Sequence, residues 1–173
     1  INRIRRNKEK EEKIISILEE NKVIYEIFGP NSHLQLITRC KELLEIMFEY
    51  DKITQDDLTL IWNATKKGDL EAKLAILKIL KEISETLKPQ YAHLLLKDML
   101  SDLSSDLINE EIELICEMCL VQDDDELTEK CINYLIEYII QEGIDEGPKV
   151  KKITNKIHYI TTRKTKFKTI VLK

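Results

Sequence analysis

Turn-forming residues are scarce throughout this chain. It contains four Gly and three Pro among 173 residues, a share of about 4% where soluble proteins have roughly 12%. Because β-sandwiches and barrels need frequent turns, this scarcity argues against an all-β fold. The apolar content of 43% can form a core, and the aromatic content of 6% indicates that Leu and Ile fill most of it. No apolar run approaches the roughly 20 residues that a transmembrane helix requires.

Apolar residues recur at spacings of three and four along most of the chain, which is the pattern of amphipathic helices. Consecutive helices pair into units at about 31–67, 69–102 and 104–143. Each unit has the length of a two-helix repeat of the armadillo or HEAT class. We therefore predict an all-α fold, an α-α superhelix of armadillo/HEAT-like helical hairpins, over residues 1–147. A helix bundle is the rival architecture, because it also buries amphipathic helices.

The short segment FGPNS carries helix-boundary signals. Gly29 is expected to end one helix in a left-handed conformation, and Pro30 cannot continue that helix. Asn31 or Ser32 is then a good N-cap for the next helix, which is predicted to run to about residue 49.

Other helix ends are predicted from capping residues. Thr54, followed three residues later by Asp57, resembles a capping box and should begin a helix. Asp69 is expected to cap the next helix, and Pro89 fits the first position of the one after it. Pro148 indicates the start of a further helix, and no structure is predicted for the last dozen residues.

Charge is distributed unevenly along the chain. Residues 1–147 carry 18 Lys/Arg and 32 Asp/Glu, a net charge of −14, whereas residues 148–173 carry 9 Lys/Arg and no acid, a net charge of +9. Between Lys97 and Lys130 there are 12 acids and no base. This run predicts an acidic strip on the surface that attracts basic partners. The candidate residues of the acidic strip are Glu110, Glu111, Glu113, Glu117, Asp123, Asp124 and Asp125.

The basic segment 148–173 is expected to form a separate C-terminal helix or extension. Its positive charges could supply the electrostatic part of binding to nucleic acid or to an anionic membrane. Only Tyr159 and Phe167 are aromatic there, so a platform for stacking bases is poorly supported. The alternatives are a solvated helix face or a strip that docks on an acidic neighbour, for which residues 98–129 are the obvious candidate. Nucleic acid is therefore not the expected partner.

Four cysteines, Cys40, Cys116, Cys119 and Cys131, lie within apolar helical patterns and are expected to be reduced, buried thiols. The pair Cys116-x-x-Cys119 lacks the second pair of ligands that a structural zinc site needs. It also lies within a helix, whereas a thioredoxin-like motif follows a strand. No Gly-rich loop is present to bind a phosphate. The sequence therefore predicts no metal, no cofactor and no catalytic residue.

Trp62 is the one tryptophan of the chain. It shares an apolar helical face with Leu58, Ile61 and Thr65, which favours a core anchor over an exposed binding residue. A buried indole N–H normally has a hydrogen-bond acceptor, so we expect an acceptor beside Trp62.

Residues 27–62 combine several distinctive elements. They are Phe28-Gly29-Pro30-Asn31, His33, Ile37-x-Arg39-Cys40, Leu43-Leu44, Ile53-Thr54 and Leu60-Ile61-Trp62. This stretch resembles part of the very large ubiquitin-specific proteases of the fat-facets type, and the likeness extends over about residues 22–87. In that family the part lies in helical-repeat regions outside the catalytic domain. The resemblance implies an α-α repeat fold and a structural motif formed by Phe28, Gly29, Pro30, Asn31, His33 and Trp62.

The catalytic Cys and His boxes of that family have no match in this chain. The resemblance therefore implies a cysteine-type deubiquitinase as the parent protein and a non-catalytic scaffold and interaction role for these residues. The expected partners are proteins, including ubiquitinated substrates, and the rest of a longer chain. Because the chain begins with Ile1 and shows no signal peptide, we expect an internal piece of an intracellular protein, in the cytoplasm ahead of the nucleus. Two alternatives are a helical-repeat adaptor unrelated to ubiquitin, and a module that binds nucleic acid or an anionic surface through the basic segment.

Overall fold

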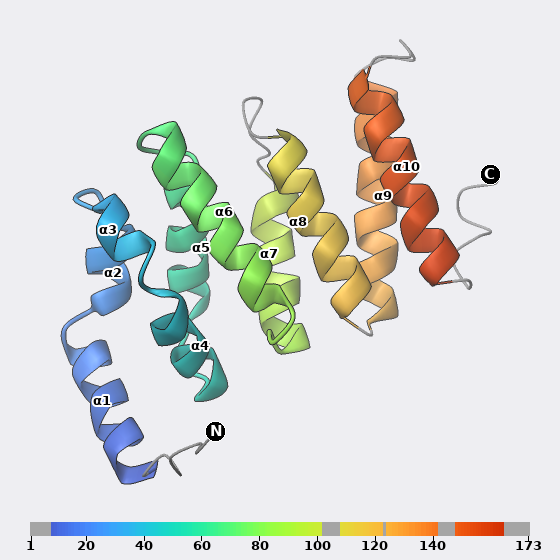
Figure 1. The fold of residues 1–173 in the computed structure, drawn as a ribbon. Coiled ribbons are helices and arrows are strands. Elements are labelled where there is room, and N and C mark those ends of the chain that lie inside the picture. Colours follow the sequence, from blue (N-terminus) through green and yellow to red (C-terminus); the bar gives the residue numbers. More distant parts are fainter. Residues whose placement is uncertain (1–7, 102–107, 123, 142–147, 165–173) are drawn as a thin grey trace, which may run out of the picture. The chain divides into compact units, whose positions relative to one another are not determined.

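The described part of the chain is almost entirely helical (Figure 1). A computed structural model describes residues 8–101, 108–122, 124–141 and 148–164, and within these ranges it contains ten helices and no strand. The helices are α1 (Lys8–Glu20), α2 (Val23–Phe28), α3 (Leu34–Ile37), α4 (Lys41–Glu49), α5 (Gln55–Ala64), α6 (Leu70–Ser84), α7 (Pro89–Ser101), α8 (Ile108–Val121), α9 (Asp125–Gln141) and α10 (Pro148–Arg163). The predicted all-α helical-repeat fold is confirmed.

The chain divides into two compact units, residues 1–79 and residues 80–173. The division falls inside α6, which contributes its first turns to the first unit and its last turn to the second. The expected limit at residue 147 lies inside the second unit, because α10 packs against α8 and α9 there.

Helices of the second unit contact alternate helices as well as consecutive ones. α8 packs against α9 and α10, and α7 packs against α8 and α9. α8 and α10 therefore form one layer, and α7 and α9 form the other (Figure 1). Contacts between alternate helices are typical of stacked two-helix repeats, in which each repeat covers the next. The pattern favours a repeat stack over the rival bundle in this unit.

In the first unit, α2 is the central element, since it packs against α1, α3 and α5. The core of this unit includes the buried side chains of Ile24, Phe28, Leu44, Leu58 and Trp62. Burial of such apolar side chains is the main stabilising term for both units.

The helix predicted to run from Asn31 or Ser32 to residue 49 is interrupted. α3 begins at Leu34 with His33 as its N-cap, and neither predicted residue caps it. Hydrogen bonds with a spacing of three residues then tighten the chain, from Arg39 N to Leu36 O and from Cys40 N to Ile37 O. Such 3₁₀-type turns commonly separate helices. Here the turn ends at the buried Cys40, after which α4 begins.

Gly29 ends α2, but the predicted left-handed conformation is wrong. Its φ of −75° and ψ of −170° describe extended backbone, which any residue can adopt. A Cβ at this position would clash with the backbone carbonyl oxygen of Tyr25, the same oxygen that accepts a hydrogen bond from Gly29 N at 2.7 Å. Glycine is therefore required by a close approach of two backbone segments.

The other predicted helix starts, at Thr54, Asp69, Pro89 and Pro148, are confirmed. Thr54 Oγ1 accepts from Asp57 N at 3.1 Å, and Thr54 N donates to Asp57 Oδ2 at 2.9 Å, which completes the capping box that begins α5. Ala72 N donates to Asp69 Oδ1 at 2.8 Å at the start of α6. Helices α7 and α10 begin at the predicted prolines.

Some apolar side chains on the amphipathic helices are exposed. Ile14 on α1 has 50% of its surface exposed, and Leu70 and Leu74 on α6 have 59% and 38%. On α6 the first buried residue is Ile76, one to two turns after the helix starts. The apolar residues of the first turns therefore lie outside the core.

Candidate interaction surfaces

The acidic strip does not form one exposed face. Glu110 is exposed near the start of α8, but Glu111 is completely buried, so its expected place on the surface is wrong. Position 111 lies on the same helix face as the buried residues Leu114, Ile115 and Met118, which follow it at spacings of three, four and seven. The charge of Glu111 is therefore not available to an external partner.

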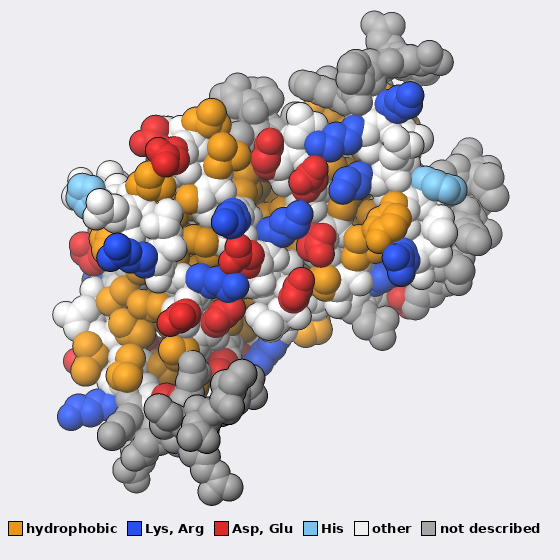
Figure 2. Space-filling model, in the orientation of Figure 1, with side chains coloured by type: hydrophobic (Ala, Val, Ile, Leu, Met, Phe, Trp, Pro, Cys, Tyr) orange, Lys and Arg blue, Asp and Glu red, His pale blue; other side chains and the backbone are white. Residues whose placement is uncertain are grey.

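Glu113 faces the basic helix α10. Its Oε1 lies 3.1 Å from Lys152 Nζ, and this contact lowers the pKa of Glu113, with smaller contributions from Lys156 and Lys81. Figure 2 shows acidic side chains over α8 next to basic side chains over α10. The basic segment thus docks, over its described part, on the acidic segment of the same chain. Docking on an acidic neighbour was one of the alternatives to binding nucleic acid or an anionic membrane.

Asp124 has a structural role at the start of α9. Its Oδ1 accepts a hydrogen bond from Leu127 N at 2.9 Å, and its Oδ2 lies 2.8 Å from His93 Nε2. The backbone hydrogen bond is the larger cause of the lowered pKa of Asp124, and the contact with His93 is the second. Asp125 is exposed and Glu117 is half-buried, whereas Asp123 lies outside the described residues.

The buried Gln122, in the turn between α8 and α9, forms hydrogen bonds with residues from distant parts of the chain. Gln122 Nε2 donates to Ser84 O at 3.1 Å and to Leu87 O at 2.8 Å. Lys164 Nζ donates to Gln122 O and, at 3.0 Å, to Thr128 Oγ1. We call His93, Gln122, Asp124, Thr128 and Lys164 the polar junction. The sequence did not reveal this cluster, because His93 and Lys164 lie far along the chain from residues 122–128 and no local pattern connects them.

The family-like motif combines buried and exposed positions. Phe28 and Gly29 are buried, whereas Pro30, Asn31 and His33 are exposed. The motif borders a cavity of about 400 Å³ between α2 and α5, lined by Tyr25, Phe28, Gly29, Pro30, Ser32, Leu60, Asn63, Ala64, Lys67 and Gly68. The motif therefore shapes one wall of a cavity as well as a helix connection.

Trp62 is a core residue, as predicted, with 2% of its surface exposed. Lys66 Nζ lies 4.4 Å from the centre of its ring, in the geometry of a cation–π contact. The expected acceptor for its N–H is not found, since no described residue forms a hydrogen bond with Trp62 Nε1. Packing and the Lys66 contact therefore account for its position.

All four cysteines are buried and free. Burial raises the pKa of Cys40 to about 11 and that of Cys116 to about 12. The pKa of Cys119 is also raised, first by its contact with Cys131 and then by burial. Thiols in this state are poor nucleophiles, because the reactive form is the thiolate. Over the described ranges, no three His, Cys, Asp or Glu side chains are placed to hold a metal ion.

None of the described helices has both the length and the apolar character needed to span a membrane.

One curated protein shares significant similarity with this chain over 81 residues. It is the ubiquitin carboxyl-terminal hydrolase puf of Drosophila melanogaster, to which the aligned part is 30% identical. The alignment covers 47% of this chain and 2% of that protein. No protein-family model matches the chain. No solved structure matches it either. The similarity relates this chain to a small part of a ubiquitin hydrolase.

Proposed function

We propose that this chain is a non-catalytic scaffold and protein-interaction segment of a large, cysteine-type ubiquitin-specific protease. The observation that carries the proposal is the 30% identity over 81 residues to a ubiquitin carboxyl-terminal hydrolase of which those residues form 2%. The motif that resembles the fat-facets type of these proteases lies in the first unit. Helical repeats support such a role, because stacked helices offer extended surfaces to partners.

The state of the thiols supports the non-catalytic part of the proposal. A cysteine protease needs a thiolate beside a histidine that can take its proton. In this chain all four thiols are buried, and the pKa is raised for Cys40, Cys116 and Cys119. The described thiols therefore suit a core and not a nucleophile.

The proposed partners are proteins, among them ubiquitinated substrates, together with other parts of a longer chain. We also place the protein inside the cell, in the cytoplasm, because free cysteines persist in reducing compartments. The basic helix supports binding to nucleic acid less well, since Lys152 and Lys164 are engaged by residues of α8, α9 and their connecting turn.

The test compares the natural full-length protein with a version that lacks residues 8–164. Both are treated with ubiquitin that carries an electrophile at its C-terminus, and the proteins that co-purify with each are identified by mass spectrometry. We expect equal labelling by the ubiquitin probe and loss of a set of bound proteins from the shortened version. The control is a full-length protein with the substitution Lys151→Gln, which removes one exposed charge on α10.

Two results would contradict the proposal. If this chain alone reacts with the ubiquitin probe, the segment is catalytic. If the full-length protein neither reacts with the probe nor cleaves ubiquitin conjugates, the chain belongs to a helical-repeat adaptor unrelated to ubiquitin.

A further inference from the structure

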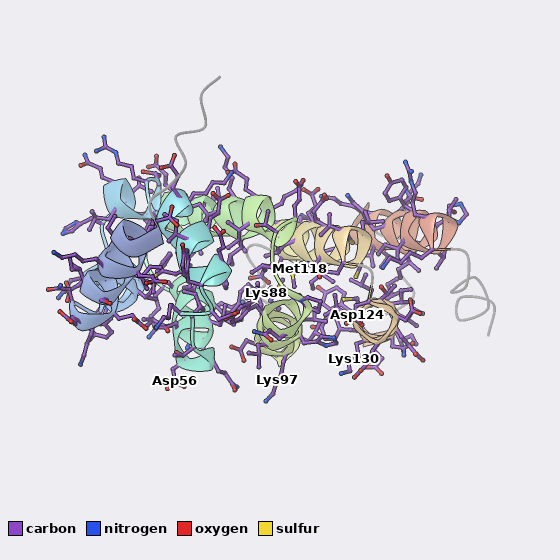
Figure 3. The ribbon with its side chains drawn as sticks, turned by 90° about the horizontal axis from the view of Figure 1, so that it is seen from below. Asp56, Lys88, Lys97, Met118, Asp124 and Lys130 are labelled. Atoms are coloured by element: carbon purple, nitrogen blue, oxygen red, sulfur yellow. The ribbon has the colours of Figure 1, made fainter. Side chains whose placement is uncertain are left out.

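A groove between α7 and α9 brings together the two bases at the ends of the acidic run. Lys97 on α7 and Lys130 on α9 are 33 positions apart, with no Lys or Arg between them. The groove has a volume of about 480 Å³ and lies within the second unit. Its lining, so far as the structure describes the chain, consists of His93, Leu94, Leu96, Lys97, Leu100 and Lys130. Figure 3 shows Lys97 and Lys130 on the same side of α7 and α9.

The two ammonium groups are available to a ligand. The Lys97 side chain is exposed and forms no hydrogen bond or ion pair with another described residue. Lys130 pairs with Glu126 on its own helix at 2.6 Å, and both side chains are more than half exposed. Exposed pairs of this kind contribute little stability, so Lys130 can exchange Glu126 for another carboxylate.

The acid that contacts His93 of the groove lining is already engaged. Asp124 accepts a hydrogen bond from Leu127 N, and its second oxygen contacts His93 at the groove wall. Leu94, Leu96 and Leu100 supply an apolar floor between the charged walls. The site therefore offers two cations around a hydrophobic surface, which is the complement of a short segment that carries carboxylates and an apolar side chain.

We propose that this groove binds an acidic, leucine-bearing peptide segment of a protein partner. One apolar side chain of the segment contacts the leucine floor, and flanking carboxylates pair with Lys97 and Lys130. This inference names the kind of partner that the proposed scaffold would recruit, and its role in the cell rests on that proposed function. A nucleic acid fits less well, because the described lining of the groove includes no Phe, Tyr or Trp on which a base could stack, whereas its leucines suit an apolar side chain.

The experiment measures binding of a short fluorescein-labelled peptide of alternating Glu and Leu to the whole chain by fluorescence anisotropy. We expect binding that weakens at high salt. In the double variant Lys97→Glu/Lys130→Glu we expect affinity to fall about tenfold or more, because two attractive contacts become repulsive. The matched control is Lys151→Glu, which reverses an exposed charge on α10 away from the groove and should leave affinity unchanged.

Further probes separate the apolar and ionic parts of the inference. A peptide with Ala in place of Leu and one with Lys in place of Glu should both bind at least about tenfold more weakly. Three results would overturn the inference: no binding of the Glu/Leu peptide, equal loss in Lys151→Glu, or tighter binding of a single-stranded oligonucleotide that depends on Lys97 and Lys130. Each of these leaves the ubiquitin-probe test of the proposed function unaffected, so the two can fail separately.

Discussion

The connection between α2 and α3 in the first unit and the connection between α8 and α9 in the second are built in different ways. At the first, Gly29 allows its backbone to lie against the Tyr25 carbonyl, and no side-chain hydrogen bond caps the next helix. At the second, Gln122, Asp124 and Lys164 bind backbone and side-chain groups of several helices. The first connection should therefore be destabilised by a larger side chain at position 29. The second should be destabilised by loss of the polar side chains that form its hydrogen bonds.

The position of the single tryptophan makes this comparison measurable. Trp62 lies in the core of the first unit, so its fluorescence reports unfolding there, whereas far-ultraviolet circular dichroism reports the helices of both units. Denaturant unfolding followed by both signals can assign the effect of each substitution to one unit. A chain with two units need not unfold in one step.

The largest effect is expected for Trp62→Ala in the first unit. Removal of a large buried side chain leaves a cavity, and we expect a loss of about 3–5 kcal/mol in the free energy of unfolding. Circular dichroism must follow this variant, because the fluorophore is lost. Trp62→Phe serves as the control and should lose clearly less, since it keeps most of the volume and removes a donor for which the described residues provide no acceptor. Equal losses would show that packing does not hold this position.

The next largest effect is expected for Gln122→Met in the polar junction. The substitution keeps the volume but leaves the carbonyls of Ser84 and Leu87 without their donor, at a cost of about 1–3 kcal/mol. We expect the circular dichroism transition to move to lower denaturant more than the Trp62 fluorescence transition does. Lys151→Met on the exposed side of α10 is the control. An equal shift of both transitions would contradict a stabilising role limited to the second unit.

Gly29→Ala should destabilise the first unit by about 1–3 kcal/mol, because the added Cβ meets the Tyr25 carbonyl. Gly68 offers a matched comparison, since its φ is +84° and a Cβ there would lie 3.9 Å from the nearest side chain, Ala72. Asn tolerates a left-handed conformation, so Gly68→Asn should cost less than Gly68→Ala. At position 29, Asn and Ala should cost about the same. If Gly29→Asn costs clearly less than Gly29→Ala, the glycine is required by its backbone conformation and not by the close contact with the Tyr25 carbonyl.

Local signals in the sequence predicted most helix ends. The capping box at Thr54 and Asp57 and the cap at Asp69 depend on residues three positions apart, so the sequence contains all the information needed. The glycine at position 29 was recognised as a helix end, but its physical cause was not. A positive φ and a close backbone approach both select glycine, and only the three-dimensional path of the chain separates them.

The candidate surface residues were harder to predict, because exposure depends on distant helices. Glu111 belongs to an acidic run, yet it is completely buried. Burial raises the pKa of Tyr134 on α9, and Tyr138 and Glu111 contribute less. Charge density along the sequence cannot show which acid faces a neighbour. The groove at Lys97 and Lys130 was missed for the same reason, since the sequence shows only that these two bases bracket the run.

Asp124→Ala should cost about 1 kcal/mol at neutral pH, because the substitution removes the N-cap of α9 and the contact with His93. Asp124→Asn should cost less, since asparagine caps a helix nearly as well and loses only the charge. Unfolding at neutral pH, followed by circular dichroism, gives both values. Equal costs for the two variants would mean that the charge and not the cap is the stabilising feature.

The smallest effect is expected for Glu113→Gln, which removes the ion pair between α8 and α10. Both partners are partly exposed, so the loss should be about 0–1 kcal/mol and should vanish at high salt. Lys152 holds the pKa of Glu113 below its usual 4.5, so the pair stabilises the folded state above that pH, and the stabilisation is lost as the pH falls through the lowered value. The variant should therefore show a weaker loss of stability on acidification than the wild type. If the two unfolding curves keep the same separation as the pH falls below 4.5, the pair does not stabilise the contact between α8 and α10 through its charge.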